Sequence, residues 1–157
     1  MSKYRNSENI DYINQEIIKM LSIDGRMAYS EIAKELKISN SLVHQRIKKL
    51  QDTGIISGFS IQLNAKEIGY ETITYTGVAT KEARFAYSIA EHLKEIPEVV
   101  ECHFVSGKYA LFLKIVAVNN EEFRKVLYEK IHNIEGVGST DSFISFGSAF
   151  QKNISLL

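Results

Sequence analysis

The segment from residue 39 to residue 49 carries side chains that suit contacts with a nucleic acid. It contains three basic residues, Arg46, Lys48 and Lys49, and no acidic residue. Its other polar side chains are short or carry amides, and such groups hydrogen-bond to base edges in the major groove. Taken alone, this charge bias fits a solvated helix face better than a DNA contact. The elements around the segment must decide between the two interpretations.

Motifs of common catalytic and metal sites are missing from the sequence. It contains no C-x-x-C, H-E-x-x-H, G-x-S-x-G or G-x-x-x-x-G-K-S/T pattern. Cys102 and His103 are adjacent, so in a strand they point to opposite faces and cannot hold one metal ion together. A small buried thiol is the expected state of Cys102. We therefore predict no enzyme, no cofactor and no metal site.

Hydrophobic spacing over the first 54 residues predicts three helices. Apolar residues recur every three or four positions from Ile10 to Leu21, and Gly25 follows that run. Ser30 is the expected N-cap of a short second helix, and Ser39 that of a third. Two helices joined by so short a connection form a helix-turn-helix, whose second member enters the major groove. A plain three-helix bundle would show the same apolar pattern, but the acid-free third helix favours DNA.

The third helix divides into a buried face and an outward face. Val43, Ile47 and Leu50 form the buried stripe. The outward residues expected to read bases are Asn40, Ser41, His44, Gln45 and Lys48. Arg46 and Lys49 lie beside that face and suit phosphates, and Ser39 completes the predicted DNA-binding set at the start of the helix.

Beyond Gly54 the pattern changes to alternating strands and helices. Residues 55–63 are rich in β-branched and aromatic side chains and suggest an extended hinge strand. The elements expected after it are strands at 70–80, 99–105, 109–118 and 137–146 and helices at 85–96 and 121–134. Their order is that of a ferredoxin-like βαββαβ domain, with the most apolar strand, 109–118, in the centre of the sheet. The predicted fold class is thus α+β. The chain is expected to consist of a winged-helix-like helix-turn-helix domain (1–55), a hinge (56–69) and the ferredoxin-like domain (70–157).

Bulk composition sets limits on the class of protein. Apolar residues make up 45% of the 157 positions and charged residues 24%, which is ordinary for a globular protein. The net charge is zero, which counts against a nonspecific nucleic-acid coat but not against a local basic surface. A single cysteine suits a reducing compartment, and no run of about 18 apolar residues suggests a membrane span. We expect a cytoplasmic protein.

Several short motifs, in this order and spacing, resemble the Lrp/AsnC family of leucine-responsive and feast/famine regulators, and the AsnC type in particular. The likeness runs from Ile10 to about Phe150. In the N-terminal part the matching fragments are Ile10-Asp11-x-x-Asn14-x-x-Ile17-Ile18, Asp24-Gly25-Arg26, Arg46-Ile47-x-x-Leu50 and Gly54-Ile55-Ile56-x-Gly58-Phe59. In the C-terminal part they are Val100-Glu101-Cys102-His103-x-Val105-Ser106-Gly107-Lys108-Tyr109 and Gly136-Val137-x-Ser139-Thr140.

The resemblance implies a regulator that binds double-stranded DNA as a homodimer, commonly assembles into octamers and responds to an amino acid. It places the effector between dimers, beside a turn and a strand segment. The implied effector residues are Ser106, Gly107, Lys108, Tyr109, Ala110, Ser139, Thr140 and Asp141. In that setting Asp141 would bind the ammonium of the amino acid, and backbone N–H groups of the glycine-containing turn would approach its carboxylate. Without the resemblance, a simple hairpin and a solvated strand residue explain the same positions.

Two departures from the family pattern bear on these roles. Asn14 stands where the family often has Asp, and asparagine can also cap a helix. Ala110 stands where many members carry an acidic residue, which removes a possible charged ligand contact. The alternatives left open are a ligand-binding oligomer without DNA affinity and an architectural DNA-binding protein without an effector.

Overall fold

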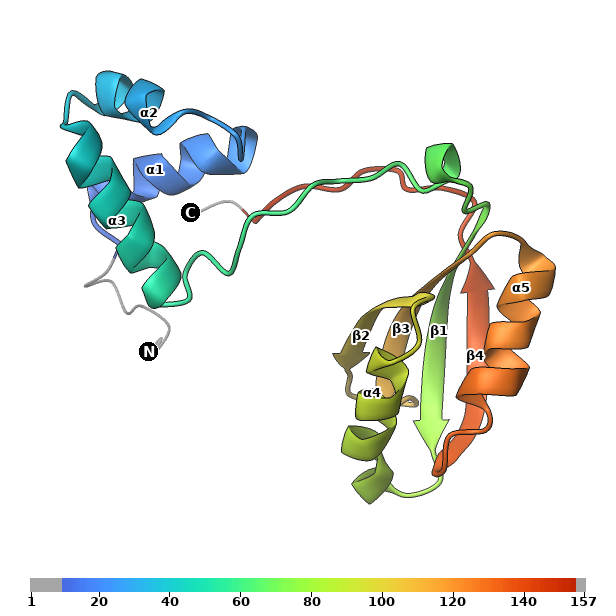
Figure 1. Ribbon diagram of the computed structural model, residues 1–157. Coiled ribbons are helices and arrows are strands. Elements are labelled where there is room, and N and C mark those ends of the chain that lie inside the picture. The colour runs from blue at the N-terminus through green and yellow to red at the C-terminus, as the bar shows by residue number, and fades with distance from the viewer. Residues whose placement is uncertain (1–9, 155–157) are drawn as a thin grey trace. The chain divides into compact units, whose positions relative to one another are not determined.

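A computed structural model describes residues 10–154 (Figure 1). The chain divides into two compact units. The first comprises the chain up to Gln62 together with the segment from Phe150 onward, and the second is Leu63–Ala149. Asn153 belongs to the first unit, where its Nδ2 donates to the carbonyl oxygen of Ser22 at 2.8 Å. Asn153 therefore contacts the N-terminal helical part of the chain.

Three helices make up most of the first unit: α1 (Tyr12–Ile23), α2 (Tyr29–Leu36) and α3 (Asn40–Asp52). Asp11 caps α1, where its Oδ1 accepts from the backbone N–H of Asn14 at 2.9 Å. The cap of α1 is thus Asp11, and Asn14 lies one turn inside the helix with only 3% of its surface exposed. Apolar residues from all three helices close the core: Ile17, Leu21, Ile32, Ala33, Val43, Ile47 and Leu50.

The connection between α2 and α3 has the short geometry expected of a helix-turn-helix. Lys37 ends α2 in the left-handed conformation, with φ of 53°. Ser39 then caps α3, as predicted, by accepting from the backbone N–H of Leu42 at 3.2 Å. The cap predicted for α2 is wrong. That helix begins after Ala28, without a side-chain cap, so Ser30 lies in its first turn.

The strand expected within residues 55–63 does not form. In the described chain no strand lies between α3 and Thr72, and residues 55–71 contain one helical turn, a 3-10 turn at Lys66–Ile68. The side chains of Ile61 and Leu63 are 77% and 64% exposed. A strand needs a partner for its backbone N–H and C=O groups, and β composition by itself supplies none.

The second unit is a four-stranded antiparallel sheet with two helices, as predicted (Figure 1). Its strands are β1 (Thr72–Thr80), β2 (Val99–Phe104), β3 (Leu111–Ala117) and β4 (Val137–Ile144), in the order β2-β3-β1-β4. The helices are α4 (Ala86–Lys94), which follows a 3-10 turn at Ala83–Phe85, and α5 (Asn120–Lys125), which continues as a π-helical turn over Val126–Ile131. The βαββαβ order and the interior place of β3 confirm the predicted ferredoxin-like domain.

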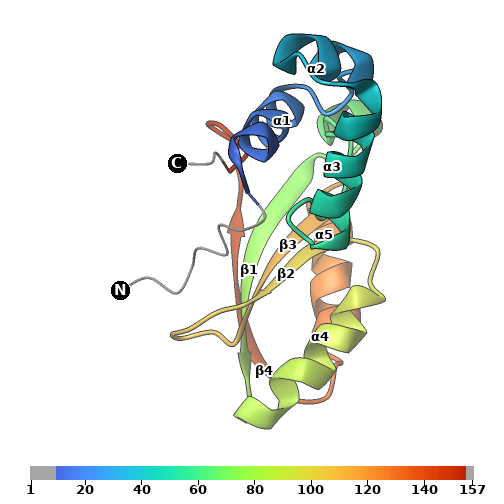
Figure 2. The ribbon, with the colours of Figure 1, turned by 90° about the vertical axis from the view of Figure 1, so that its left-hand side faces the viewer.

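Both helices cover the same face of the sheet (Figure 2). Strand β3 shows why, because its residues alternate between buried and half-buried positions. Leu111, Leu113 and Ile115 pack under the helices, with Ile89, Leu93 and Ile131 among their neighbours in the core. The opposite face is open and carries Tyr75, Phe112, Lys114, Val116 and Phe143. No helix in residues 10–154 is long and apolar enough to cross a membrane.

Candidate functional site

The outward face of α3 presents the predicted base-reading residues. Asn40, Ser41, His44, Gln45 and Lys48 are all exposed, whereas Val43, Ile47 and Leu50 are buried. The cap residue Ser39 also supports this end, because its Oγ lies 3.0 Å from the Oγ of Ser41. One short helix therefore displays amide, hydroxyl, imidazole and ammonium groups on a single solvent-facing surface.

His44 packs against an aromatic residue of α2 that sequence reasoning missed. The rings of Tyr29 and His44 meet edge to face, with their centroids 4.6 Å apart. A shallow hollow of about 660 Å³ beside them is lined by Tyr29, His44, Gln45, Ile47, Lys48, Gln51 and Asp52. Tyr29 starts α2 one turn before the buried Ile32 and Ala33, so its helical spacing could have placed it on this side. The contact joins the outward face of α3 to the start of α2.

Arg46 differs from its basic neighbours because it pairs with α1. Its Nη1 donates to Oδ2 of Asp11 and lies 3.5 Å from Oδ1 of Asn14. The Arg46 side chain is 28% exposed, whereas Lys48 and Lys49 are exposed residues. The N–H of Asn14 lowers the pKa of Asp11, partial burial opposes this, and Arg46 lowers the pKa further. Arg46 thus has a structural partner that the sequence did not reveal.

The predicted effector turn joins β2 to β3. The N–H of Val105 donates to the carbonyl of Ala110 at 3.1 Å, and the N–H of Ala110 donates to the carbonyl of Val78 at 2.9 Å. Gly107 takes φ of 119°, a conformation that side chains rarely adopt, so the glycine is required by the turn. These bonds fix the ends of the turn to the sheet.

The turn and β4 meet at Asp141. Lys108 Nζ and Tyr109 Oη both donate to Oδ2 of Asp141, at 2.6 Å and 2.7 Å. The hydrogen bonds from Lys108 and then from Tyr109 lower the pKa of Asp141. Tyr109 reaches Asp141 across β1, where Gly77 offers no side chain in its way. The structure therefore brings three of the predicted effector residues together: Lys108, Tyr109 and Asp141.

Thr140 points away from this cluster. Adjacent residues of a strand alternate between faces, so Thr140 lies on the face opposite Asp141, while Ser139 shares the face of Asp141. The Oγ1 of Thr140 lies 2.8 Å from Nε2 of His132, whose ring in turn meets Tyr128 edge to face at 5.1 Å. Of the predicted effector residues in β4, Ser139 and Asp141 thus lie on one face of the sheet and Thr140 on the other.

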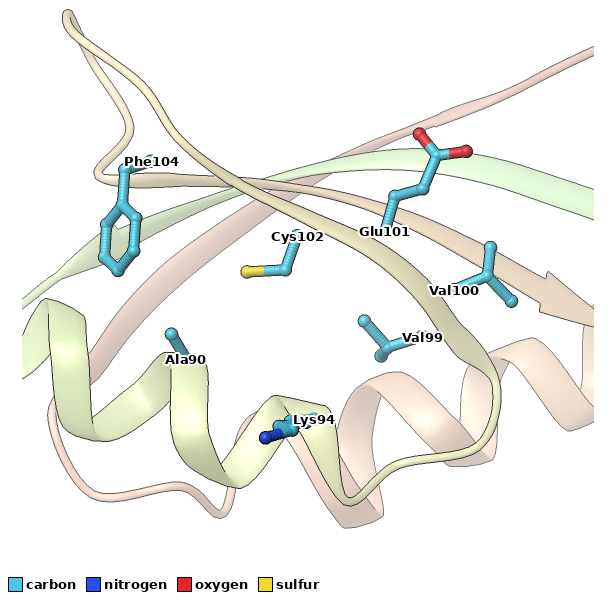
Figure 3. Close-up of a pocket in the computed structure, with 7 residues that line it drawn as sticks. All are labelled: Ala90, Lys94, Val99, Val100, Glu101, Cys102 and Phe104. Carbon is cyan, nitrogen blue, oxygen red and sulfur yellow. The ribbon is translucent and has the colours of Figure 1, made fainter. Parts of the chain in front are cut away.

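A separate hollow of about 290 Å³ lies between α4 and the edge strand β2 (Figure 3). It is lined by Ala90, Lys94, Val99, Val100, Glu101, Cys102 and Phe104, and by none of the predicted effector residues. Cys102 is exposed, which contradicts the buried thiol expected from the sequence. The reason is that β2 lies at the edge of the sheet, where α4 covers its side chains only in part. Partial burial still raises the pKa of the Cys102 thiol.

Two arrangements within residues 10–154 offer groups for binding. No group of three or more His, Cys, Asp or Glu residues in this range could hold a metal ion. The outward face of α3 offers donors and acceptors for base edges, and the Lys108–Tyr109–Asp141 cluster offers one cation and one carboxylate. These two arrangements occur in different units of the chain.

Comparison with known proteins assigns both units. A model described as winged helix-turn-helix DNA-binding matches residues 10–57, and one described as Lrp/AsnC ligand binding domain matches residues 75–154. The regulatory protein AsnC of Haemophilus influenzae is 32% identical over 146 residues, which cover 93% of this chain and 97% of that protein. The chain belongs to the Lrp/AsnC family. This Lrp/AsnC protein is also 38% identical over 128 residues to the transcriptional regulator LrpA of Pyrococcus horikoshii, covering 82% of this chain and 90% of that protein.

Solved structures agree with this assignment. The structure of Escherichia coli AsnC matches with a TM-score of 0.85 at 30% identity, covering 92% of this chain and 97% of that one. A regulator from Neisseria meningitidis, solved as an L-Met complex, has the same fold with a TM-score of 0.85 at 21% identity, covering 94% and 96%. The Lrp/AsnC protein is thus a transcriptional regulator with a DNA-binding and a ligand-binding domain, and its relatives are regulators, not enzymes.

Proposed function

We propose that this Lrp/AsnC regulator binds specific double-stranded DNA as a homodimer and that a free amino acid modulates its binding or assembly. The observation that carries the proposal is the exposed outward face of α3, which carries no acidic residue between Asn40 and Lys49, within a matched helix-turn-helix domain. A regulator that acts on the chromosome would work in the cytoplasm.

In this proposal α3 enters the major groove. Asn40, Ser41, His44, Gln45 and Lys48 read base edges, and Lys49 contacts a phosphate. The amide of Gln45 can pair with adenine in a bidentate manner, and Lys48 can donate to guanine. Two copies of α3 related by a two-fold axis would require an operator with matching half-sites about one helical turn apart.

The effector would lie at the Ser106–Ala110 turn. A free amino acid carries an ammonium and a carboxylate, and the turn supplies a complementary pair, Asp141 and Lys108. These two groups bind each other at 2.6 Å, so the zwitterion would insert between them and exchange one ion pair for two. The Neisseria regulator, which shares the fold, was solved with an amino acid, L-Met.

The open face of the sheet would form the dimer contact. Tyr75, Phe112, Val116 and Phe143 place apolar side chains on it, and Tyr75 and Phe143 are 39% and 57% exposed. Burial of such a face against a second copy would stabilise the dimer by the hydrophobic effect. Further association of dimers into an octamer is part of the same proposal.

Fluorescence anisotropy on DNA from upstream of the protein's own gene tests the proposal. The titration would include a scrambled competitor, a salt series and a pool of amino acids. We expect binding that resists the competitor, weakens with salt and shifts when the pool is added. Amino-acid binding without DNA preference would instead indicate a ligand-binding oligomer. DNA binding indifferent to every amino acid would indicate an effector-independent architectural protein.

A further inference from the structure

Arg46 and Asp11 form a contact that ties the middle of α3 to the start of α1. The two carboxylate oxygens of Asp11 accept hydrogen bonds from different donors. Oδ1 caps α1 through the N–H of Asn14, and Oδ2 accepts from Nη1 of Arg46. One carboxylate thereby fixes both the first turn of α1 and the α3 turn that carries His44 and Gln45.

We propose that the Asp11–Arg46 ion pair orients α3 for sequence reading and that Arg46 is a positioning residue, not a phosphate contact. This inference rests on the proposed function, because it concerns how the same helix reads DNA. It replaces the phosphate role that the sequence suggested for Arg46.

The directional character of the contact supports this role. The buried side chains of α3, Val43, Ile47 and Leu50, are apolar, and apolar contacts have no preferred direction. A charge-assisted hydrogen bond between a guanidinium and a carboxylate does have one. The pair therefore restricts rotation of α3 about its own axis, which determines where Gln45 and His44 point.

The charge balance also supports a positioning role for Arg46. Arg46 is already neutralised by Asp11, so bringing it close to a phosphate would add little to the release of counterions that drives nonspecific binding. Lys49 is exposed and influences Asp11 only through its charge, without a hydrogen bond. Lys49 is therefore the matched control, since it is a neighbouring cation that remains available to a phosphate.

Three variants separate positioning from phosphate contact. Asp11→Asn removes the charge but keeps a side-chain oxygen for the cap, because Asn and Asp are equally good N-caps. Arg46→Gln removes the cation, and Lys49→Gln is the control. Affinity for a duplex selected from a random pool and for its scrambled version would be measured by anisotropy over a salt series. Circular dichroism at the assay temperature confirms that each variant is folded.

We expect Asp11→Asn and Arg46→Gln each to weaken binding to the selected duplex by about three- to tenfold. Neither substitution should change the slope of log K against log salt. The double variant should bind the selected duplex as tightly as the single variant that binds it less well, because both substitutions break the same contact. Lys49→Gln should weaken both duplexes and make the slope shallower by about 0.9.

The opposite results would overturn the inference. One is a slope of log K against log salt that becomes shallower by about 0.9 in Arg46→Gln. Another is an unchanged affinity for the selected duplex in Asp11→Asn, and a third is a tighter affinity of Asp11→Asn for both duplexes. The last result would mean that Asp11 acts only as a negative charge near DNA. Failure of the proposed function itself looks different, because the unmodified protein would then show no preference for the selected duplex.

Discussion

The ring of Tyr109 packs directly on the backbone of Gly77, where an added Cβ would lie 2.5 Å from Tyr109 Cδ2. Because of this fit, Tyr109 lies flat across β1 and its hydroxyl reaches Asp141 on the next strand. We therefore expect Gly77→Ala to displace the ring and break its hydrogen bond to Asp141. Overpacking of this kind costs about 1–3 kcal/mol of folding free energy. Thermal unfolding and amino-acid calorimetry would measure both effects.

The matched control for this change is Gly58→Ala, because nothing lies within 4 Å of a Cβ at that position. Its effect on stability should be within about 0.5 kcal/mol. Equal destabilisation by the two substitutions would contradict the packing argument, since only one of them meets an aromatic ring.

Asp141→Asn is expected to abolish or strongly weaken amino-acid binding, because an amide cannot neutralise an ammonium. Lys108→Met should also weaken amino-acid binding, because the carboxylate of the ligand would lose its cationic partner. Calorimetry with a free amino acid, its N-acetyl derivative and its amide would assign the two ends of the ligand. Glu121→Gln is the control, since Glu121 is an exposed carboxylate of α5 in a comparable ion pair with Arg124 at 2.8 Å. Full amino-acid affinity in Asp141→Asn would exclude the proposed site.

Asp11 should make the stability of the protein depend on pH in acid. The pKa of Asp11 is lowered in the folded state, mainly by the N–H of Asn14 and then, against partial burial, by Arg46. Its stabilisation is therefore complete above the unfolded pKa, about 3.9, and is lost as pH falls through the folded value. The Asp11 side chain is 48% exposed, so the contribution should stay below about 1 kcal/mol.

Urea unfolding at pH 7 and pH 3 would test this dependence. Asp11→Asn should lose less stability between the two pH values than the unmodified protein, and Asp52→Asn, at the end of α3, serves as the control carboxylate. An identical loss in Asp11→Asn and the unmodified protein would show that Asp11 takes no part in the acid response.

Gln45→Ala should change which DNA sequences are preferred. Loss of a bidentate base contact costs about 1–3 kcal/mol at the contacted base pair and leaves other positions unaffected. Selection from a random duplex pool, followed by sequencing, would show relaxed preference at one position in each half-site. A uniform loss of affinity across all sequences would instead show that Gln45 contacts the DNA backbone and not a base.

Phe143→Asp should weaken the dimer, because it puts a charge into the apolar open face of the sheet. Analytical ultracentrifugation at micromolar concentration should show monomers for this variant and dimers or larger species for the unmodified protein. Phe150→Asp, which changes an aromatic residue that is 77% exposed outside that sheet, is the control. Unchanged sedimentation of Phe143→Asp would show that the open face does not form the dimer contact.

Sequence reasoning predicted the elements well where local chemistry decides them. The cap at Ser39, the buried stripe through Ile47 and the interior place of the apolar strand β3 all follow from the residues of one element, and the structure confirms them. The strand expected in residues 55–63 is absent, because pairing depends on a partner and not on composition.

The site residues were harder to predict because their partners are distant in the chain. Arg46 meets Asp11 across 35 positions, and Lys108 meets Asp141 across 33. Such contacts follow from tertiary packing, which periodicity does not describe. Cys102 illustrates the same limit, because whether a strand lies at the edge of the sheet decides its exposure.

The contact between Asn153 and Ser22 joins residues 131 positions apart, so the second unit is inserted within the first along the chain. During synthesis, α1, α2 and α3 can pack before the second unit is made, because their core contains no residue of that unit. The C-terminal segment can join them only after the whole sheet domain has been translated. A deletion that removes Asn153 would therefore take away a contact of α1, which is encoded at the opposite end of the gene.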